Sequence, residues 1–210
     1  MVYFFTKLTI IPVVKLWVSN VNGLENLPKK EAFIAAANHT SYMDHLIIGS
    51  YLITHLNKKV HFLAKKEHFD NILKKAWHTH SGAIPIDRQS GGKKALRLAI
   101  SALKNGKIIA IHPEGTRSLT GKLQRGKTGV ARLALLTKAP VVPVGLIGTF
   151  EILPKGKYLP KFKRAIMNIG KPMDFREYYN KKISKRILRE VTDKVMKEIA
   201  KLSYQEYGEL

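Results

Sequence analysis

Short apolar runs alternate with segments whose apolar residues recur at helical spacing, from residue 32 almost to the end of the chain. Each run ends at a polar or glycine-containing cluster, which is typical of a buried strand. The predicted strands cover residues 32–37, 60–64, 82–86, 107–111, 141–147 and 164–169. Helices are predicted at residues 42–53, 69–78, 129–136 and 183–202, and between a capping Ser90 and a terminating Gly106. This alternation indicates an α/β fold with a mixed, mostly parallel sheet flanked by helices.

The domain organisation follows from length and composition. A chain of 210 residues is long enough for one domain with a full core, and no internal repeat or linker divides it. Hydrophobic residues make up 45% and charged residues 25%, which excludes disorder as the main state. We therefore expect an apolar segment at residues 1–21, followed by one α/β domain at residues 22–210 that ends in a basic amphipathic helix.

The chain contains no cysteine, which excludes a thiol nucleophile and every cysteine-ligated metal site. His78 and His80 are spaced like metal ligands, but no third ligand accompanies them. The eight histidines raise the alternative of a metal-dependent hydrolase, but the sequence lacks the set of metal ligands that such an enzyme needs. We expect no metal ion and no cofactor.

The charge balance points to anionic partners. Lysine and arginine number 37 against 15 acidic residues, so the formal net charge is +22. Such a surface attracts nucleic acid, anionic lipid headgroups or phosphorylated substrates, and the charge alone does not choose among them. The chain has no helix-turn-helix, RNA-recognition or zinc-finger signature. A nucleic-acid-binding protein is therefore the alternative of a different class, and an anionic membrane surface is the partner we expect.

Residues 1–21 are the most apolar stretch at either end of the chain. Lys7 and Lys15 interrupt this stretch and Pro12 lies in its middle, which argues against a membrane-spanning helix. Aromatic residues such as Trp17 beside lysines suit a lipid–water interface, although the segment would equally suit packing on the core. We expect peripheral or monotopic attachment to a membrane, at its cytoplasmic face.

One polar cluster follows the strand at residues 32–37 and contains His39 and Asp44. Ser41 is a candidate N-cap for a helix that begins at Tyr42, which places Asp44 in the first turn. A chain reversal here would bring the carboxylate to one imidazole nitrogen and leave the other as a base. The alternative is that Asp44 only favours the helix N-terminus electrostatically while His39 is a loop residue.

Three further clusters follow later predicted strands. Asp87 and Arg88 form one, in which Arg88 would bind a phosphate or make a surface ion pair. The second, residues 112–118, places glycine and several donors and acceptors directly after a strand, more than a structural turn needs. The third, residues 139–144, is an apolar strand framed by prolines, for which a structural role is the default.

Taken in order, the four clusters resemble the blocks of the glycerophospholipid acyltransferase family, the lysophosphatidic acid acyltransferases in particular. His39 and Asp44 match the His-x4-Asp block, and GAIPIDR at residues 82–88 matches the second. HPEGTRS at residues 112–118 and APVVPV at residues 139–144 match the third and fourth. The likeness runs from about residue 20 to about residue 170, and four blocks in the right order are far more specific than any one of them.

The resemblance implies transfer of a fatty acyl group from a thioester, either acyl-CoA or acyl carrier protein, to the hydroxyl of a lysophospholipid. His39 would be the general base and Asp44 would orient its imidazole, with no acyl-enzyme. The leading acceptor is 1-acyl-sn-glycerol 3-phosphate, which gives phosphatidic acid. Another lysophospholipid or a glycolipid is the alternative, because the motifs report the reaction and only loosely the headgroup.

The resemblance also assigns a pocket for the phosphate of the acceptor. Its residues would be Arg88, Glu114, Gly115, Arg117 and Lys66. Glu114 is acidic, so we expect it to orient Arg88 or a substrate hydroxyl. His112 departs from the family, which usually has an aromatic residue there. We expect its ring to pack in the same way, with a second titrating group at the site as the alternative.

Overall fold

The computed structural model describes residues 3–72, 75–76, 79, 81–87 and 92–208. Within these residues seven strands form one sheet, in the order β1-β7-β6-β2-β5-β3-β4. The strands are β1 (Val18–Asn22), β2 (Ile34–Ala37), β3 (Val60–Lys65), β4 (Ile84–Ile86), β5 (Ile108–Ile111), β6 (Val141–Ile147) and β7 (Ala165–Ile169). β6 and β7 are antiparallel, and the other described pairs are parallel. The predicted mixed, mostly parallel sheet is confirmed.

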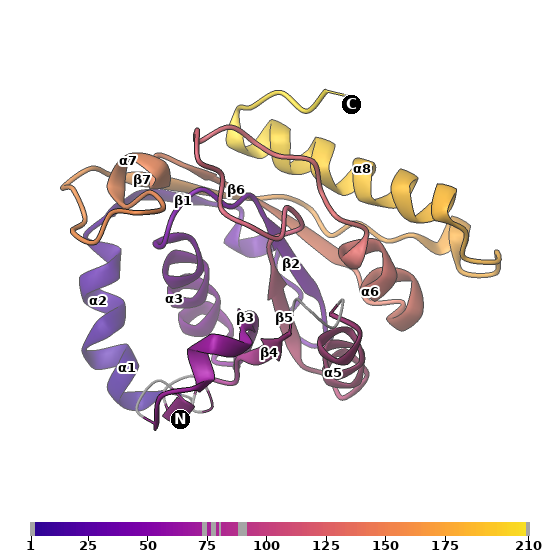
Figure 1. The fold of residues 1–210 in the computed structure, drawn as a ribbon, viewed down its shortest axis with the longest axis horizontal. Coiled ribbons are helices and arrows are strands. Elements are labelled where there is room, and N and C mark those ends of the chain that lie inside the picture. Colours follow the sequence, from indigo (N-terminus) through magenta and orange to yellow (C-terminus); the bar gives the residue numbers. More distant parts are fainter. Residues whose placement is uncertain (1–2, 73–74, 77–78, 80, 88–91, 209–210) are drawn as a thin grey trace.

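Helices cover both faces of this sheet (Figure 1). On one face lie α1 (Phe4–Leu8), α2 (Ile10–Lys15) and α3 (Asp44–Leu56); on the other lie α5 (Lys93–Lys104), α6 (Gly129–Thr137) and α8 (Lys185–Ser203). The remaining helical elements are α7 (Thr149–Ile152), η1 (Leu24–Asn26), η2 (Lys66–Phe69) and η3 (Arg176–Tyr178). Because both faces are covered, the central strands β2 and β5 are buried along their whole length and read as continuous apolar runs.

The register of β2 and β5 determines where the polar clusters that follow these strands lie. Ile34 of β2 pairs with Ile109 of β5, and Ala36 pairs with Ile111. The two parallel strands therefore end almost level, at the same edge of the sheet. The clusters that follow them, beginning at Asn38 and His112, must meet there, as expected for ligand sites of open α/β sheets.

The N-terminal segment folds as two short helices and an edge strand. The expected boundary at residue 21 falls inside β1, which pairs with β7. Pro12 lies in the first turn of α2, where its missing N–H breaks no helical hydrogen bond. Ile11 and Val14 of α2 are buried, whereas Leu8, Val13 and others of this segment are exposed. Among the described residues, no helix combines the length and apolarity needed to cross a bilayer.

Two predicted helix starts were wrong and part of a third helix is not described. α3 begins at Asp44, two residues later than expected, because Ser41 forms an isolated bridge with Pro154. The hydroxyl of Ser41 accepts a hydrogen bond from Met43 N ahead of the helix and does not cap it. α5 begins at Lys93. Arg88 and Ser90, together with His78, His80 and part of the helix predicted at residues 69–78, lie outside the described residues.

Candidate active site

The carboxylate of Asp44 reaches the ring of His39. Its Oδ2 lies 2.8 Å from His39 Nδ1 and also accepts hydrogen bonds from the N–H groups of Thr40 and Ser41, both at 2.8 Å. The chain therefore reverses over residues 39–44, as the first interpretation of this cluster predicted. Because a carboxylate can only accept, Nδ1 carries the ring proton and the basic lone pair is on Nε2.

The carboxylate of Asp44 is shielded from solvent. Its side chain is 0% exposed, and burial raises its pKa above the ordinary value. The hydrogen bonds from the N–H groups of Thr40 and Ser41 oppose that rise, since they favour the carboxylate. Asp44 thus serves as a fixed acceptor that sets the tautomer and orientation of His39.

The backbone of His39 is held on both sides by the cluster at residues 112–118. Its N–H donates to Glu114 Oε1 at 2.5 Å, and its carbonyl accepts from Ser118 N at 2.8 Å. These contacts join the ends of β2 and β5. They fix the position of the imidazole from a strand other than its own.

Glu114 is buried and bonded through both carboxylate oxygens. Its Oε2 accepts from Gln124 N at 2.9 Å and from Gln124 Nε2 at 3.1 Å, and burial raises its pKa to about 7. Sequence reasoning missed Gln124, and the only signal was its place in residues 121–127, which follow the cluster at residues 112–118 and are rich in glycine and cations. The expected part of Glu114 in orienting Arg88 stays a prediction, because Arg88 is not described.

His112 stacks on His39, with ring centroids 3.9 Å apart and planes 8° from parallel. Its Nδ1 lies 3.0 Å from the carbonyl oxygen of Asn38 and 3.2 Å from that of Ala37, so Nδ1 carries the proton. Burial and the neighbouring His39 lower the pKa of His112 to about 3. His112 is therefore neutral near neutral pH, and the geometry agrees with a ring that packs and positions.

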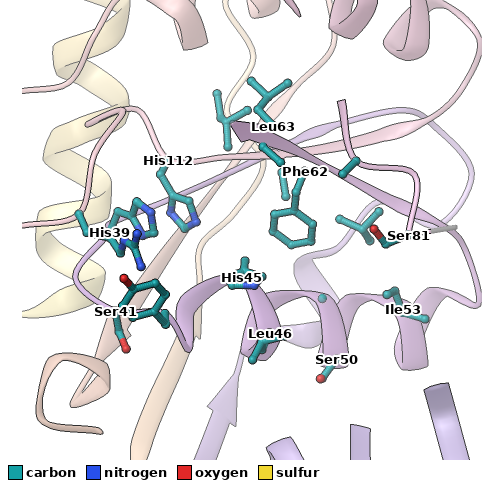
Figure 2. A pocket seen from close by; sticks show the side chains of 18 of the residues that line it. His39, Ser41, His45, Leu46, Ser50, Ile53, Phe62, Leu63, Ser81 and His112 are labelled. Carbon is teal, nitrogen blue, oxygen red and sulfur yellow. The ribbon is translucent and has the colours of Figure 1, made fainter. Parts of the chain in front are cut away.

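A cavity of about 560 Å³ opens beside these two rings. Figure 2 shows it between α3 and β3, with His39 and His112 at one end and Ser81 and Ile53 toward the other. Most of its wall is apolar and comes from the N-terminal helices, α3, β3 and the residues before and within β4. These wall residues include Tyr3, Ile10, Ile11, Leu46, Gly49, Ile53, Val60, Phe62, Leu63, Ala64, Ala83 and Ile86.

His45 adds a polar group to this wall that sequence reasoning missed. Its ring is accessible from the cavity and meets Phe62 edge to face, with centroids 6.1 Å apart (Figure 2). The protein atoms around it lower its pKa to about 4, chiefly by burial, so it is neutral near neutral pH. Its position next to Asp44 on α3 was the only signal in the sequence.

The cations expected at a phosphate are placed unequally. Arg117 lines the cavity and its guanidinium carbon lies 3.5 Å from the centroid of the Tyr42 ring, a cation–π contact. Gly115 has φ +73°, and a Cβ there would meet the Lys127 side chain at 3.1 Å. Lys66 Nζ lies 3.8 Å from Asp87 Oδ2 and is not among the described residues of the cavity wall. Arg88 is outside the described residues.

The part of the chain that the structure describes contains no group of three or more His, Cys, Asp or Glu residues able to hold a metal ion. The site instead contains an imidazole hydrogen-bonded to a buried carboxylate. A guanidinium lines the apolar cavity beside them. This set can move a proton and bind an anion next to an apolar chain.

Comparison with known proteins identifies the family of this chain. A family model described as "Acyltransferase" matches residues 18–147. The 1-acyl-sn-glycerol-3-phosphate acyltransferase of Bacillus subtilis is 32% identical over 153 residues, which cover 73% of this chain and 72% of the relative. The enzyme of that name from Streptococcus pneumoniae is 28% identical over 205 residues, covering 95% of this chain and 73% of the relative.

A solved structure resembles the whole fold. The crystal structure of the 1-acyl-sn-glycerophosphate (LPA) acyltransferase PlsC from Thermotoga maritima superposes with a TM-score of 0.70 at 27% identity. The match covers 98% of this chain and 84% of the Thermotoga chain, so it includes the N-terminal helices as well as the sheet.

Proposed function

This chain belongs to the acyltransferase family, and from that premise we propose that it acylates the free hydroxyl of 1-acyl-sn-glycerol 3-phosphate, giving phosphatidic acid. The reaction belongs to phospholipid biosynthesis. The observation that carries the proposal is the contact between His39 Nδ1 and the buried Asp44, 2.8 Å long, at the end of an apolar cavity that Arg117 also lines.

The proposed mechanism uses His39 as a general base. Its Nε2 takes the proton of the acceptor hydroxyl while the hydroxyl oxygen attacks the thioester carbonyl carbon. The C–S bond then breaks, and the leaving thiolate takes up the proton from the imidazolium. The carboxylate of Asp44 stabilises the imidazolium between these steps, and a positioned base of this kind contributes about 10²–10⁴-fold.

Direct transfer without an acyl-enzyme is supported by what surrounds His39. The chain has no cysteine. The nearby hydroxyl of Ser41 donates to Leu153 O at 2.7 Å and accepts from Met43 N at 3.0 Å. These bonds hold the hydroxyl in the bridge between two chain segments, and they leave it poorly suited to attack a thioester.

We assign the apolar cavity to a fatty acyl chain. Its size falls within the range of about 300–1,000 Å³ that is usual for sites that bury a small ligand. Apolar side chains from α2, α3 and β3 enclose it, and His39 lies at its end. A chain bound along this wall would place its ester or thioester end beside the base.

The phosphate of the acceptor is assigned to Arg117, with Arg88, Lys66, Gly115 and Glu114 as further candidates on the resemblance. Arg117 is supported most directly, because it lines the cavity and stacks on Tyr42. A charge-assisted hydrogen bond to phosphate is worth about 1.5–3 kcal/mol. The donor is acyl-CoA or acyl carrier protein, and another lysophospholipid or a glycolipid is the second acceptor class.

Association with an anionic membrane is the remaining part of the proposal. The lipid substrates reside in bilayers, and the segment at residues 1–21 exposes Phe4, Leu8, Val13 and Leu16. The net charge of +22 favours an anionic surface. The attachment we propose is peripheral or monotopic.

A thiol-release assay tests the reaction. Acyl-CoA and acyl carrier protein thioesters are each combined with lysophosphatidic acid, lysophosphatidylcholine or monoacylglycerol. We expect thiol release with lysophosphatidic acid, lowered about 10²–10⁴-fold by His39→Ala. His55→Ala, an exposed histidine of the same helix as Asp44 that does not line the cavity, is the matched control. Near-normal turnover by the His39 variant would remove this residue from the mechanism.

A further inference from the structure

A ten-residue loop between α7 and β7, residues 155–164, is unusual in its exposure. Its sequence is KGKYLPKFKR, and every residue in it is exposed. Tyr158 is 89% exposed, Leu159 84% and Phe162 74%. Single exposed apolar side chains are ordinary, but three large ones within five residues form a patch that needs a partner.

The positive charges of the same loop favour an anionic partner. It carries Lys155, Lys157, Lys161, Lys163 and Arg164 and no acidic residue. Aromatic and aliphatic side chains interleaved with cations match the headgroup region of an anionic bilayer, where apolar groups enter the acyl boundary and lysines remain at the phosphates.

The loop is fixed at both ends. At its start, the carbonyl of Leu153 accepts from Tyr42 N at 3.0 Å and from Ser41 Oγ at 2.7 Å. Toward its end, Trp17 Nε1 donates to the carbonyl of Lys161 at 3.0 Å, and the Trp17 ring meets that of Phe162 edge to face. The patch is thus held against the protein, and little ordering would be needed on binding.

The loop is continuous with the exposed side of the N-terminal helices. In Figure 1 it lies at the upper left, beside the end of α2. Trp17, which contacts the loop, directly follows exposed Leu16. At the other end of the loop, Lys155 lines the cavity that contains His39. A bilayer that touches this loop would therefore lie beside the N-terminal helices and the cavity that contains His39.

We propose that the 155–164 loop is a second membrane-binding element, which docks onto an anionic bilayer beside the N-terminal helices. The proposal deepens the membrane association proposed above and rests on it. Tyr158, Leu159 and Phe162 enter the lipid–water interface, and the lysines around them pair with lipid phosphates.

Because the chain has no cysteine, one introduced thiol reports insertion at a chosen site. Leu159→Cys is labelled with the environment-sensitive fluorophore NBD, and Tyr204→Cys, exposed at the end of α8, is the matched control. Vesicles are an equal mixture of phosphatidylcholine and phosphatidylglycerol, or phosphatidylcholine alone. We expect a blue shift and increased emission at position 159 with anionic vesicles, quenched by nitroxide-labelled lipid, and no such change at position 204.

Vesicle flotation measures how much the apolar side chains contribute. The variant Tyr158→Ser/Leu159→Ser/Phe162→Ser should reduce the partition coefficient about tenfold or more, since each large apolar group favours transfer out of water. The matched control Leu98→Ser/Leu136→Ser/Tyr204→Ser changes exposed side chains on the opposite face and should bind as the unchanged protein does. Lys157→Gln/Lys161→Gln/Lys163→Gln should weaken binding to anionic vesicles and its dependence on salt.

Two results would overturn the proposal. One is a vesicle-bound protein whose label at position 159 stays in water. The other is a response of that label to acyl carrier protein without vesicles, which would assign the loop to a protein donor. Thiol release is measured in parallel with a water-soluble, short-chain lysophosphatidic acid. Loss of insertion with normal thiol release contradicts the loop alone, whereas insertion without thiol release contradicts the reaction alone.

Discussion

The peptide group between Asn38 and His39 is held at both of its polar atoms by side chains from the end of β5. His112 Nδ1 donates to its carbonyl at 3.0 Å, and Glu114 accepts from its N–H at 2.5 Å. An aromatic hydrocarbon ring at position 112 would stack on His39 in the same way but could not donate. At this position the chain therefore adds a hydrogen bond to a packing contact.

Glu114 makes stability depend on pH. Its pKa is raised to about 7, so the folded protein holds a proton that the unfolded chain loses near pH 4.5. The stability this group contributes is full below pH 4.5 and is lost as pH rises through about 7. Relative to Glu114→Gln, which lacks the titration, the wild type should lose up to ~3 kcal/mol of unfolding free energy between pH 5 and pH 8.

Urea unfolding of both proteins across that pH range measures the difference. Taking the difference cancels the contributions of all groups that both proteins share. Glu151→Gln, an exposed carboxylate on α7, is the control and should leave the pH profile nearly unchanged. A gap between wild type and Glu114→Gln that is constant with pH would show that Glu114 does not titrate in this range.

Arg117 is expected to act on the acceptor and not on the base. Arg117→Ala should raise KM for lysophosphatidic acid about tenfold or more, because one charge-assisted hydrogen bond to phosphate is lost. Turnover of monoacylglycerol, which has no phosphate, should change little, and Arg97→Ala on α5 is a control outside the cavity wall. Equal losses with both acceptors would contradict a phosphate role.

At the scale of elements, the sheet register brings residues 38–44 and 112–118 together. β2 and β5 end nearly level, so the cluster at residues 112–118 reaches the backbone of His39 without a long loop. On the other face, α8 packs over β6 at Gly145. A Cβ on Gly145 would lie 2.2 Å from the carbonyl carbon of Leu202.

This close approach predicts the effect of one methyl group. Gly145→Ala must displace the end of α8 and should lower the free energy of unfolding by about 1–3 kcal/mol. Gly129→Ala, in the first turn of α6 with open space around its Cβ position, should be neutral or slightly stabilising. Chemical unfolding of the two variants measures both effects, and equal stabilities would contradict the packing at Gly145.

Sequence patterns predicted much of this arrangement because its signals are local. The strand at residues 32–37 and the spacing of His39 and Asp44 left two interpretations open, and the family resemblance favoured the contact that the structure shows at 2.8 Å. β1 was missed because its sequence, VSNVN, belongs to a half-exposed edge strand and lacks an apolar run. The contact of Glu114 with His39 N–H depends on two strands being neighbours, and no local pattern carries that information.

At the scale of the whole molecule, the net charge of +22 opposes compaction. Lysine and arginine outnumber acidic residues 37 to 15, so the carboxylates are too few to neutralise the cations, and the excess positive charge repels itself. We expect Tm to rise as NaCl increases from about 0.01 M to about 0.15 M, where the Debye length falls from about 30 Å to about 8 Å. Each kcal/mol recovered should raise Tm by about 2–4 °C in a chain of this size.

The control for this prediction is a variant with less positive charge. Lys182→Glu/Lys185→Glu/Lys197→Glu replaces exposed lysines at and before α8. It should melt higher than the wild type at low salt and respond less to added NaCl. A wild-type Tm that is constant or falls over this range would show that repulsion does not limit its stability.

The N-terminal helices have one face that lines the cavity and another that is exposed to solvent. Tyr3, Thr6, Ile10 and Ile11 form part of the cavity wall, and the hydroxyl of Tyr3 donates to Ser81 O at 2.9 Å. Phe4, Leu8, Val13 and Leu16 point to the exterior. Removing or replacing these helices would therefore open the cavity as well as remove the exposed apolar side chains that we propose for membrane attachment. A fusion of this domain to another membrane-binding segment must therefore retain the cavity-lining residues of both helices.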